Sequence, residues 1–391
     1  MPEWTEFTDK LGPEKILHVY DPKVGMRGVV VVDTTQMGMA GGGTRMMPDI
    51  TTEEIFGLAR AMTYKFSSLD FPIGGAKAGI WADPGITGQQ RLDIMHAFGR
   101  SIKPLLDSGI TVAADIGTDG HDVDAIYAGA SLDNKSTGLS LEEKDGEPLE
   151  NHATGYGVVV AAKAACEFAD INIKDATVAI EGFGKVGGGV ARYMDEEGAR
   201  VVAISTIEGT LYNPDGLDVK KLLELRKLYG DEVVRQYGAG ELLTTDRIFG
   251  LPMDILIPGA RPYVIDAKNV DIIQARIISS IANIPITDDA EDILYQRGIF
   301  SVPDFISNAG GVLVAIVDIL GGEAEDVFRA LRELIGSMTS SILSDARKAG
   351  VNPRKLAVQR STDKVLKTRT GEQIAPSFEE VLDIARKRLK M

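Results

Sequence analysis

The chain has 391 residues, more than one hydrophobic core usually organises, so we expect two domains. Its formal net charge of -15 argues against a nucleic-acid partner, which requires a basic footprint, and favours a small molecule. The single cysteine, Cys166, excludes an internal disulfide and suits a reducing cytoplasm. No apolar run reaches the ~20 residues that cross a bilayer, and residues 1–10 do not resemble a signal peptide, so we expect a cytoplasmic protein without a membrane span.

Strands and helices are predicted to alternate in the first third of the chain. Helix 51–66 is the clearest, because its apolar residues recur on one face and Thr51 with Glu54 makes a capping box. The other predicted elements are a strand at 27–36, a strand at 77–83, a helix at 89–102 and a strand at 109–115.

A polar, aperiodic stretch at 131–152 is predicted to be the linker between domains. After it the pattern becomes a helix and then apolar strands spaced by helices, which indicates a parallel, doubly wound sheet. The predicted helix spans 154–169, and the strand segments are 176–182, 199–205, 253–258, 276–283 and 299–303. The last 70 residues are expected to be helical and charged.

The segment "EGFGKVGGG" places Gly182, Gly184 and Gly187 in G-x-G-x-x-G spacing between an apolar strand and a helix. In that context the first glycine permits a tight turn, the second lets a pyrophosphate approach the backbone, and the third allows close packing of helix on strand. We therefore predict a dinucleotide site. The alternative is a glycine-rich turn that binds no ligand.

The next strand ends in Ser205 and Thr206, where a protein that binds the ribose of NAD usually has an acidic residue. The absence of a carboxylate there favours NADP modestly, although Glu208 stands nearby. The alternative is a merely solvated strand end that tolerates either NADP or NAD.

Two lysines and an aspartate are the candidate chemical groups of the first domain. Lys77 lies among small residues in "FPIGGAKAGI", which leave room for a ligand near its amine, and a desolvated lysine can serve as an acid or base. Lys65 ends the predicted helix 51–66, and Asp115 follows the strand 109–115. Either lysine could instead be a solvated surface group, and Asp115 could instead cap the helix that begins near His121.

His121 stands among Asp119, Asp122 and Asp124 in "GTDGHDVDAI", a composition that could hold a metal. Capping of a helix is the better interpretation, because acidic residues favour a helix N-terminus and no second histidine cluster completes a site. We predict no metal.

Four segments together resemble the glutamate/leucine/phenylalanine/valine dehydrogenase family. They are "GGGTRMMPDITTEEIFGLARAMTYKFSSLDFPIGGAKAGIWADP", "AADIGTDGHDVDAI", "GFGKVGGGVARYMDEEGARVVAIS" and "VPDFISNAGGV", in the family's order. The resemblance implies an α/β fold with a mixed-sheet domain for substrate binding and oligomerisation, a doubly wound Rossmann domain for the dinucleotide, and an active-site cleft between them. The first domain would be residues 1–135 completed by C-terminal helices at about 335–391, and the second 150–330.

The resemblance also implies residue roles. Lys65 would bind the substrate α-carboxylate, Lys77 would be the catalytic lysine, and Asp115 would pass protons to and from the amino nitrogen. The implied cofactor contacts are Thr154, Gly182, Phe183, Gly184, Lys185, Val186, Gly187, Ser205, Thr206, Asn283 and Asn308, with Asn308 and Gly310 near the nicotinamide and substrate. The chain departs from glutamate dehydrogenases at Ile281 and Ile284, where those enzymes typically have glycines.

The implied reaction is the reversible oxidative deamination of an L-amino acid to a 2-oxo acid and ammonia, in a homo-oligomer for which a hexamer is favoured. Glutamate dehydrogenases carry a lysine at position 41 and a serine at 315, which contact an anionic side chain. Here these are Gly41 and Ala315, and a carboxylate buried without a partner is disfavoured. We therefore predict a non-acidic substrate, aliphatic or aromatic, in a pocket that includes Ala113 and Val312. Glutamate is the alternative, if a cation such as Arg45 replaces the missing lysine.

Two other functions compete with this one. A 2-hydroxy-acid dehydrogenase would normally place a histidine or arginine at the reacting carbon, and the lysine-lysine-aspartate set speaks against it. A non-catalytic, nucleotide-binding paralogue would not need the lysine pair.

Overall fold

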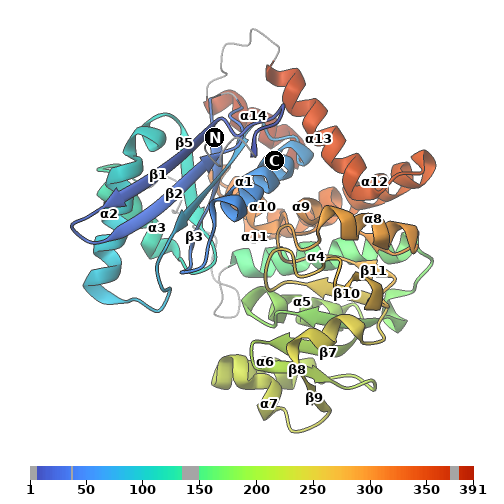
Figure 1. Cartoon of the computed structure of the whole chain (residues 1–391). Coiled ribbons are helices and arrows are strands. Elements are labelled where there is room, and N and C mark those ends of the chain that lie inside the picture. The colour runs from blue at the N-terminus through green and yellow to red at the C-terminus, as the bar shows by residue number, and fades with distance from the viewer. Residues whose placement is uncertain (1–6, 37, 134–148, 370–377) are drawn as a thin grey trace. The chain divides into compact units, whose positions relative to one another are not determined.

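The computed structural model describes residues 7–36, 38–133, 149–369 and 378–391. The chain divides into two compact units: Met1–Ser140 with Val358–Met391, called unit 1, and Leu141–Ala357, called unit 2 (Figure 1). Most of the predicted linker, at 134–148, lies outside the described residues.

Unit 1 contains a five-stranded sheet in the order β1-β2-β4-β3-β5. Its strands are β1 (Lys15–Asp21), β2 (Met26–Val32), β3 (Ala40–Met46), β4 (Gly74–Ile80) and β5 (Ile110–Ala114). β2 runs antiparallel to β1 and to β4, whereas β3 runs parallel to β4 and to β5. This is the mixed sheet that the sequence predicted, with the strand expected at 27–36 ending earlier, at Val32.

The two faces of this sheet pack against different helices. One face presents apolar residues such as Val30 and Ala78 to a core shared with Phe98 of α2 (Gly88–Asp107) and Ile126 of α3 (Gly120–Gly129). On the other face a methyl group on Gly75 would lie 2.3 Å from the carbonyl oxygen of Ala59 in α1 (Thr52–Ser68). Only glycine permits so close an approach of helix and strand.

Helix α1 is confirmed where its apolar periodicity predicted it, with Ile55, Leu58 and Ala59 buried. Thr51 is its N-cap, and the Thr51 side chain accepts a hydrogen bond from the Glu54 backbone N–H at 3.0 Å. The reciprocal half of the predicted capping box is missing, because the Glu54 carboxylate binds Arg45 instead.

Unit 2 contains a seven-stranded sheet in the order β12-β11-β10-β6-β7-β8-β9. The strands are β6 (Thr177–Glu181), β7 (Arg200–Thr206), β8 (Gly209–Tyr212), β9 (Glu241–Leu243), β10 (Ile255–Pro258), β11 (Ile277–Ile278) and β12 (Phe300–Ser301). The first five in that order are parallel, as predicted, but β8 pairs antiparallel with both β7 and β9. β8 and β9 were not predicted from the sequence. β8 pairs antiparallel because Ile207 and Glu208 alone join β7 to β8, and a parallel crossover needs about a dozen residues or more.

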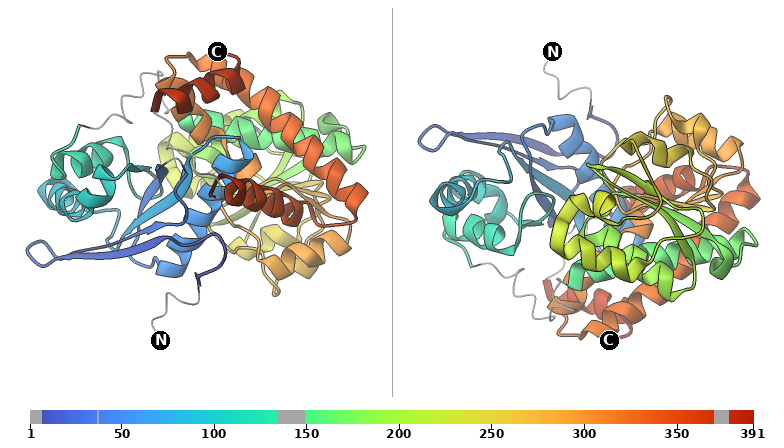
Figure 2. Two further views of the ribbon diagram at one scale, coloured as in Figure 1. Left: turned by 90° about the horizontal axis from the view of Figure 1, so that it is seen from above. Right: turned by 90° about the horizontal axis from the view of Figure 1, so that it is seen from below.

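Helices cover both faces of this sheet (Figure 2). Those of unit 2 are α4 (Leu149–Phe168), α5 (Lys185–Glu196), α6 (Val219–Tyr229), α7 (Val233–Gln236), α8 (Asp288–Gln296), α9 (Asp304–Ser307), α10 (Gly310–Ile319), α11 (Ala324–Ala330) and α12 (Gly336–Ala349). Among the described residues, no helix combines the length and the apolarity that a bilayer crossing requires.

The C-terminal helices divide between the units. α12 packs against α4 and belongs to unit 2, although residues from about 335 were expected in the first domain. α13 (Pro353–Arg369) begins in unit 2 and continues into unit 1, which also holds α14 (Phe378–Leu389). The difference arises because α12 buries its apolar side, including Ile342 and Leu343, inside unit 2.

Candidate active site

Lys77 and Asp115 form a buried ion pair in unit 1. Lys77 lies on β4 and Asp115 directly follows β5, and their Nζ and Oδ2 atoms are 2.8 Å apart. The Lys77 side chain is 5% exposed, so it is not the solvated surface group that lysine usually is. Between them, on β3, a methyl group on Gly43 would lie 2.8 Å from Asp115 Cβ and 3.1 Å from Lys77 Nζ. A glycine at position 43 is therefore what allows the pair to form.

Arg45 extends this pair into a row of alternating charges. Its side chain is buried, with Nε 3.2 Å from Asp115 Oδ2 and Nη1 2.5 Å from Oε1 of Glu54 on α1. Burial opposes ionisation of Asp115, but the nearby Lys77 and Arg45 charges outweigh it and hold the pKa of Asp115 well below its usual range. Asp115 is thus an ionised acceptor held between two cations.

Asp115 does not cap the following helix, which was the alternative interpretation. The N-cap of α3 is Asp119, which forms a complete capping box with Asp122, as the capping interpretation of this acidic segment predicted. The backbone N–H of Asp115 donates to Thr118 Oγ1 at 3.0 Å, and the Thr118 hydroxyl donates to the carbonyl of Thr44 at 2.7 Å. Thr118 fixes the turn after β5, a role that was not predicted from the sequence. No group of His, Cys, Asp or Glu in the described ranges is arranged to hold a metal ion.

The other predicted substrate residues lie in both units. Lys65 is buried on α1, at 6% exposure. On the α1 side of the unit 1 sheet, Gly41 stands opposite Thr111 and Gly43 opposite Ala113, and Thr111 and Ala113 are exposed. Val312 and Ala315 are half-buried in unit 2 and share a face of α10, being three residues apart.

The predicted dinucleotide turn joins β6 to α5 in unit 2. Gly182 has φ of +87°, a left-handed conformation, and a methyl group there would lie 2.8 Å from the backbone nitrogen of Ala260. A methyl group on Gly187 would lie 2.2 Å from the Gly182 carbonyl oxygen, so close packing of helix on strand requires glycine. Gly184 is the N-cap of α5, and no atom lies within 4 Å of a Cβ placed there. This open helix N-terminus fits a pyrophosphate.

Glu181, the last residue of β6, braces this turn and was not predicted. Its Oε2 accepts hydrogen bonds from the backbone N–H groups of Gly259 and Ala260, each at 2.9 Å. Burial raises the pKa of Glu181, although the two N–H donors oppose the shift. The signal in the sequence that could have identified Glu181 is its position, directly before the first glycine of the motif.

The hydroxyl groups of Ser205 and Thr206 form hydrogen bonds with backbone groups of the protein. Ser205 Oγ accepts from the Gly182 N–H at 3.3 Å, and the Thr206 hydroxyl donates to the carbonyl of Asp231 at 2.7 Å. Glu208, which follows the end of β7, pairs with Arg235 at 3.1 Å. The Ser205 hydroxyl therefore stabilises the glycine turn after β6, the Thr206 hydroxyl is engaged by backbone at the end of β7, and Glu208 and Arg235 pair with each other.

The two asparagines predicted to contact the cofactor, Asn283 and Asn308, lie next to each other. Asn308 Nδ2 lies 3.0 Å from Asn283 Oδ1 and 3.1 Å from the carbonyl oxygen of Ile281. Ile284 has φ of +47°, which is strained for a β-branched residue, and its N–H donates to the buried Asp304 carboxylate at 2.8 Å.

The remaining predicted cofactor residues lie around these elements. Phe183 is buried within the glycine turn, and Lys185 and Val186 open α5. A methyl group on Gly310, at the start of α10, would lie 2.6 Å from Cα of Thr154 on α4. Thr154 and the start of α10 are therefore in close contact.

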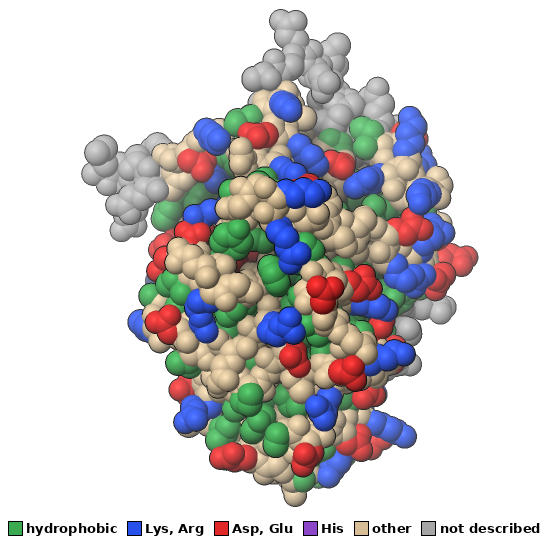
Figure 3. All heavy atoms as spheres, turned by 90° about the vertical axis from the view of Figure 1, so that its right-hand side faces the viewer, with side chains coloured by type: hydrophobic (Ala, Val, Ile, Leu, Met, Phe, Trp, Pro, Cys, Tyr) green, Lys and Arg blue, Asp and Glu red, His purple; other side chains and the backbone are tan. Residues whose placement is uncertain are grey.

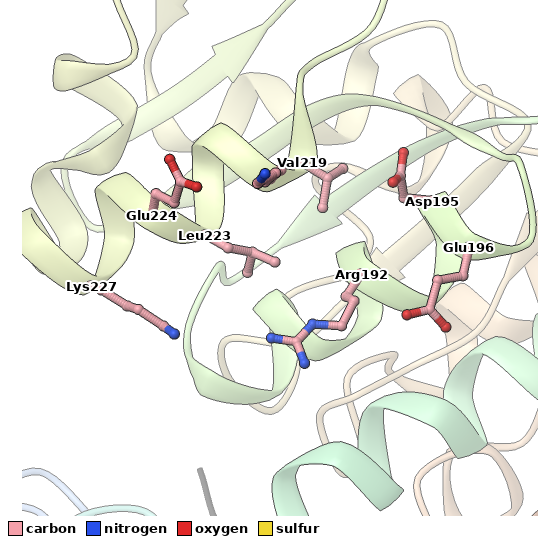
Figure 4. A pocket seen from close by; sticks show the side chains of 8 residues that line it. Arg192, Asp195, Glu196, Val219, Leu223, Glu224 and Lys227 are labelled. Carbon is pink, nitrogen blue, oxygen red and sulfur yellow. The ribbon is translucent and has the colours of Figure 1, made fainter. Parts of the chain in front are cut away.

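The surface carries charge of both signs. On the face shown in Figure 3, lysine and arginine side chains are interspersed with aspartate and glutamate. A hollow of about 320 Å³ lies between α5 and α6, and Figure 4 shows Arg192, Asp195, Leu223 and Lys227 at its edge. None of the predicted site residues lines this hollow, so it is separate from the site built above.

The fold and these residues define a class: an enzyme with a dinucleotide-binding unit and a buried lysine–aspartate pair in a second unit. The sequence model described as Glutamate/Leucine/Phenylalanine/Valine dehydrogenase matches residues 146–372. The model described as Glu/Leu/Phe/Val dehydrogenase, dimerisation domain, matches residues 13–131. The chain belongs to this family and is an amino-acid dehydrogenase, which confirms the resemblance found in the sequence.

Several proteins similar to this chain are glutamate dehydrogenases. The Thermotoga maritima glutamate dehydrogenase is 34% identical over 86% of this chain and 84% of its own length. The NADP-specific glutamate dehydrogenase A1 of Halobacterium salinarum is 32% identical over 78% of this chain and 74% of its own. The leucine-bound, hetero-hexameric glutamate dehydrogenase of Thermus thermophilus aligns with a TM-score of 0.80 and 25% identity, covering 91% of this chain and 89% of that one. Other relatives include both NADP-specific and NAD-specific glutamate dehydrogenases.

Proposed function

We propose that this protein catalyses the reversible, NAD(P)-linked oxidative deamination of an L-amino acid to the 2-oxo acid and ammonia. The observation that carries the proposal is the buried ion pair of Lys77 and Asp115, 2.8 Å apart across a glycine. A buried lysine next to an ionised carboxylate is suited to moving protons at one substrate carbon and its nitrogen.

Each side chain has one task in this mechanism. Lys65 holds the α-carboxylate as a fixed cation, which orients the amino acid. Asp115 accepts a proton from the amino group and returns one to the nitrogen as ammonia leaves. Lys77 must first give up its ammonium proton, and the neutral amine then takes a proton from water as the water oxygen bonds to the imine carbon. The dinucleotide, when bound, would accept the hydride that leaves the substrate Cα.

The residues fit a dinucleotide at the β6–α5 turn. Gly182 and Gly187 hold the tight turn, and the open backbone at Gly184 would meet the pyrophosphate at the N-terminus of α5. We retain the modest preference for NADP, because neither Ser205 nor Thr206 is acidic. Measuring kcat/KM with both cofactors tests it, and a strong preference for NAD would contradict it.

Two substrate classes remain. The names of the relatives support L-glutamate, the alternative of the sequence analysis, better than the non-acidic class. The residues favour the non-acidic class, because Gly41 and Ala315 offer no group to an anionic side chain, and Arg45 is engaged by Asp115 and Glu54. The deciding measurement is kcat/KM for glutamate against leucine, valine, methionine and phenylalanine.

Two variants test the reaction itself. Lys77→Ala should lower kcat about 100-fold or more, because it removes a proton-transfer group. Lys103→Ala, at a half-exposed lysine of α2, is the matched control and should retain wild-type turnover. Near-wild-type turnover by Lys77→Ala would refute this mechanism, and a wild type that reduces neither cofactor with any amino acid would favour the non-catalytic paralogue.

We also propose that the chain assembles as a homo-oligomer, with a hexamer favoured. The hetero-hexameric glutamate dehydrogenase of similar fold supports this assembly. Sedimentation velocity at micromolar concentration should show a single large species, and a monomer would contradict the proposal.

A further inference from the structure

Thr111 lies on the same face of the unit 1 sheet as Lys77, one row of paired strand residues away from it. Gly43 pairs with Ala113, next to Lys77, and two residues back along the strands Gly41 pairs with Gly75 and Thr111. Because side chains alternate with a period of two, both rows face the same side of the sheet. The second row therefore lies ~7 Å from the reacting groups along the strand direction.

Thr111 is the one residue of the second row that has a side chain. Helix α1 covers Gly75, where the Ala59 carbonyl oxygen lies 2.3 Å from the position of a Cβ. At the edge of the sheet, by contrast, Thr111 on β5 is exposed. A molecule lying along this face would meet the Thr111 side chain directly.

Thr111 also fills part of the space that Gly41 leaves. A methyl group on Gly41 would lie 2.7 Å from Thr111 Oγ1, which is closer than such contacts allow, so the threonine hydroxyl points across the row towards position 41. The hydroxyl approaches the carbonyl of Ala40 only at 3.5 Å, the outer limit of a hydrogen bond, so this contact holds it weakly. A glycine at 41 thus gives less room than the sequence alone suggests.

We propose that Thr111 is a specificity-determining residue whose volume, next to Gly41, sets the maximum length of the substrate side chain. The inference rests on the proposed function, since it assumes that the reacting Cα lies at Lys77 and Asp115. A side chain of up to four bonds is shorter than the distance between the two rows, so the side chains of valine, leucine and glutamate fit by length. The ring of phenylalanine extends further and meets Thr111.

The test is a comparison of kcat/KM for valine, leucine, glutamate and phenylalanine in the full-length enzyme with both cofactors. Thr111→Ala should raise the ratio of phenylalanine to valine by about 10-fold, the usual effect of one or two methylene groups in a pocket. Thr111→Val keeps the volume without the hydroxyl and should retain the wild-type order of substrates. Thr52→Ala, a threonine of α1 outside these rows, controls for the loss of a threonine, and thermal melts check folding.

A second measurement tests the contact between the two positions. Gly41→Ala should lower kcat/KM for leucine, and adding Thr111→Ala should restore most of it, because the clash at 2.7 Å is relieved. Additive effects of the two substitutions would overturn the proposal, as would an unchanged ratio in Thr111→Ala or equal changes in Thr111→Ala and Thr111→Val. A wild type inactive with every substrate would refute the proposed function and this inference together. An active wild type whose substrate preference does not change on substitution of Thr111 would refute the inference alone.

Discussion

Replacing the buried Glu291 by glutamine should change how the stability of unit 2 depends on pH. Glu291 lies on α8 and is 4% exposed. Its Oε1 accepts from the Ser301 hydroxyl at 3.1 Å, and Arg354 Nε lies 3.9 Å away. Arg354 is also 3.2 Å from the buried Asp304 carboxylate, so the same guanidinium lies near two buried carboxyl groups. Burial raises the pKa of Glu291 to about 7, against the opposing effects of Arg354 and Ser301.

The sign and size of the effect follow from that pKa. The unfolded chain has the ordinary value of 4.5, so between pH 4.5 and about 7 the folded protein keeps a proton on Glu291 that the unfolded chain releases. The resulting stabilisation is complete below pH 4.5 and is lost as the pH rises through 7. A shift of this size corresponds to about 3 kcal/mol in the free energy of unfolding.

The assay is chemical denaturation of wild type and Glu291→Gln, followed by circular dichroism from about pH 4.5 to about pH 8. Glutamine does not titrate, so the stability of the variant relative to wild type should rise by about 3 kcal/mol across this range. Glu224→Gln, at an exposed position of α6, controls for the substitution itself. A constant difference between Glu291→Gln and wild type at every pH would refute the reasoning.

Three further substitutions test the two candidate sites. Gly43→Ala should separate Lys77 from Asp115 and lower kcat about 10-fold or more, because its methyl group would lie 2.8 Å from Asp115 Cβ; unchanged kcat would count against the pair. Arg45→Met removes a cation that lowers the pKa of Asp115, so kcat/KM of this variant should fall at acidic pH, where Asp115 becomes protonated. Arg45→Lys keeps the cation and should not show this fall. Identical pH profiles for the two variants would contradict the electrostatic role. Gly182→Ala should weaken cofactor binding measured by calorimetry, because φ of +87° is strained for alanine; unaltered affinity would argue against the turn as the site.

The features that the sequence predicted correctly depend on neighbours along the chain. The apolar spacing of α1 and the oxygen of Thr51 three residues before Glu54 are local patterns, and both are present in the structure. The same holds for the β6–α5 turn, whose glycines follow an apolar strand directly. Capping of α3 by the acidic residues around His121 was likewise predicted from a local pattern, and the structure shows it as the Asp119–Asp122 capping box.

The tertiary structure decided which distant groups meet. Arg45 contacts Asp115, 70 residues away, only because β3 lies next to β5 in one register, and the same register sets Thr111 beside Gly41. The hydroxyls of Ser205 and Thr206 turn inward because the backbone of the glycine turn and of Asp231 lies next to the end of β7. Strand order and register result from packing of the whole sheet, which no local stretch of sequence encodes, so these contacts could be found only in the folded chain.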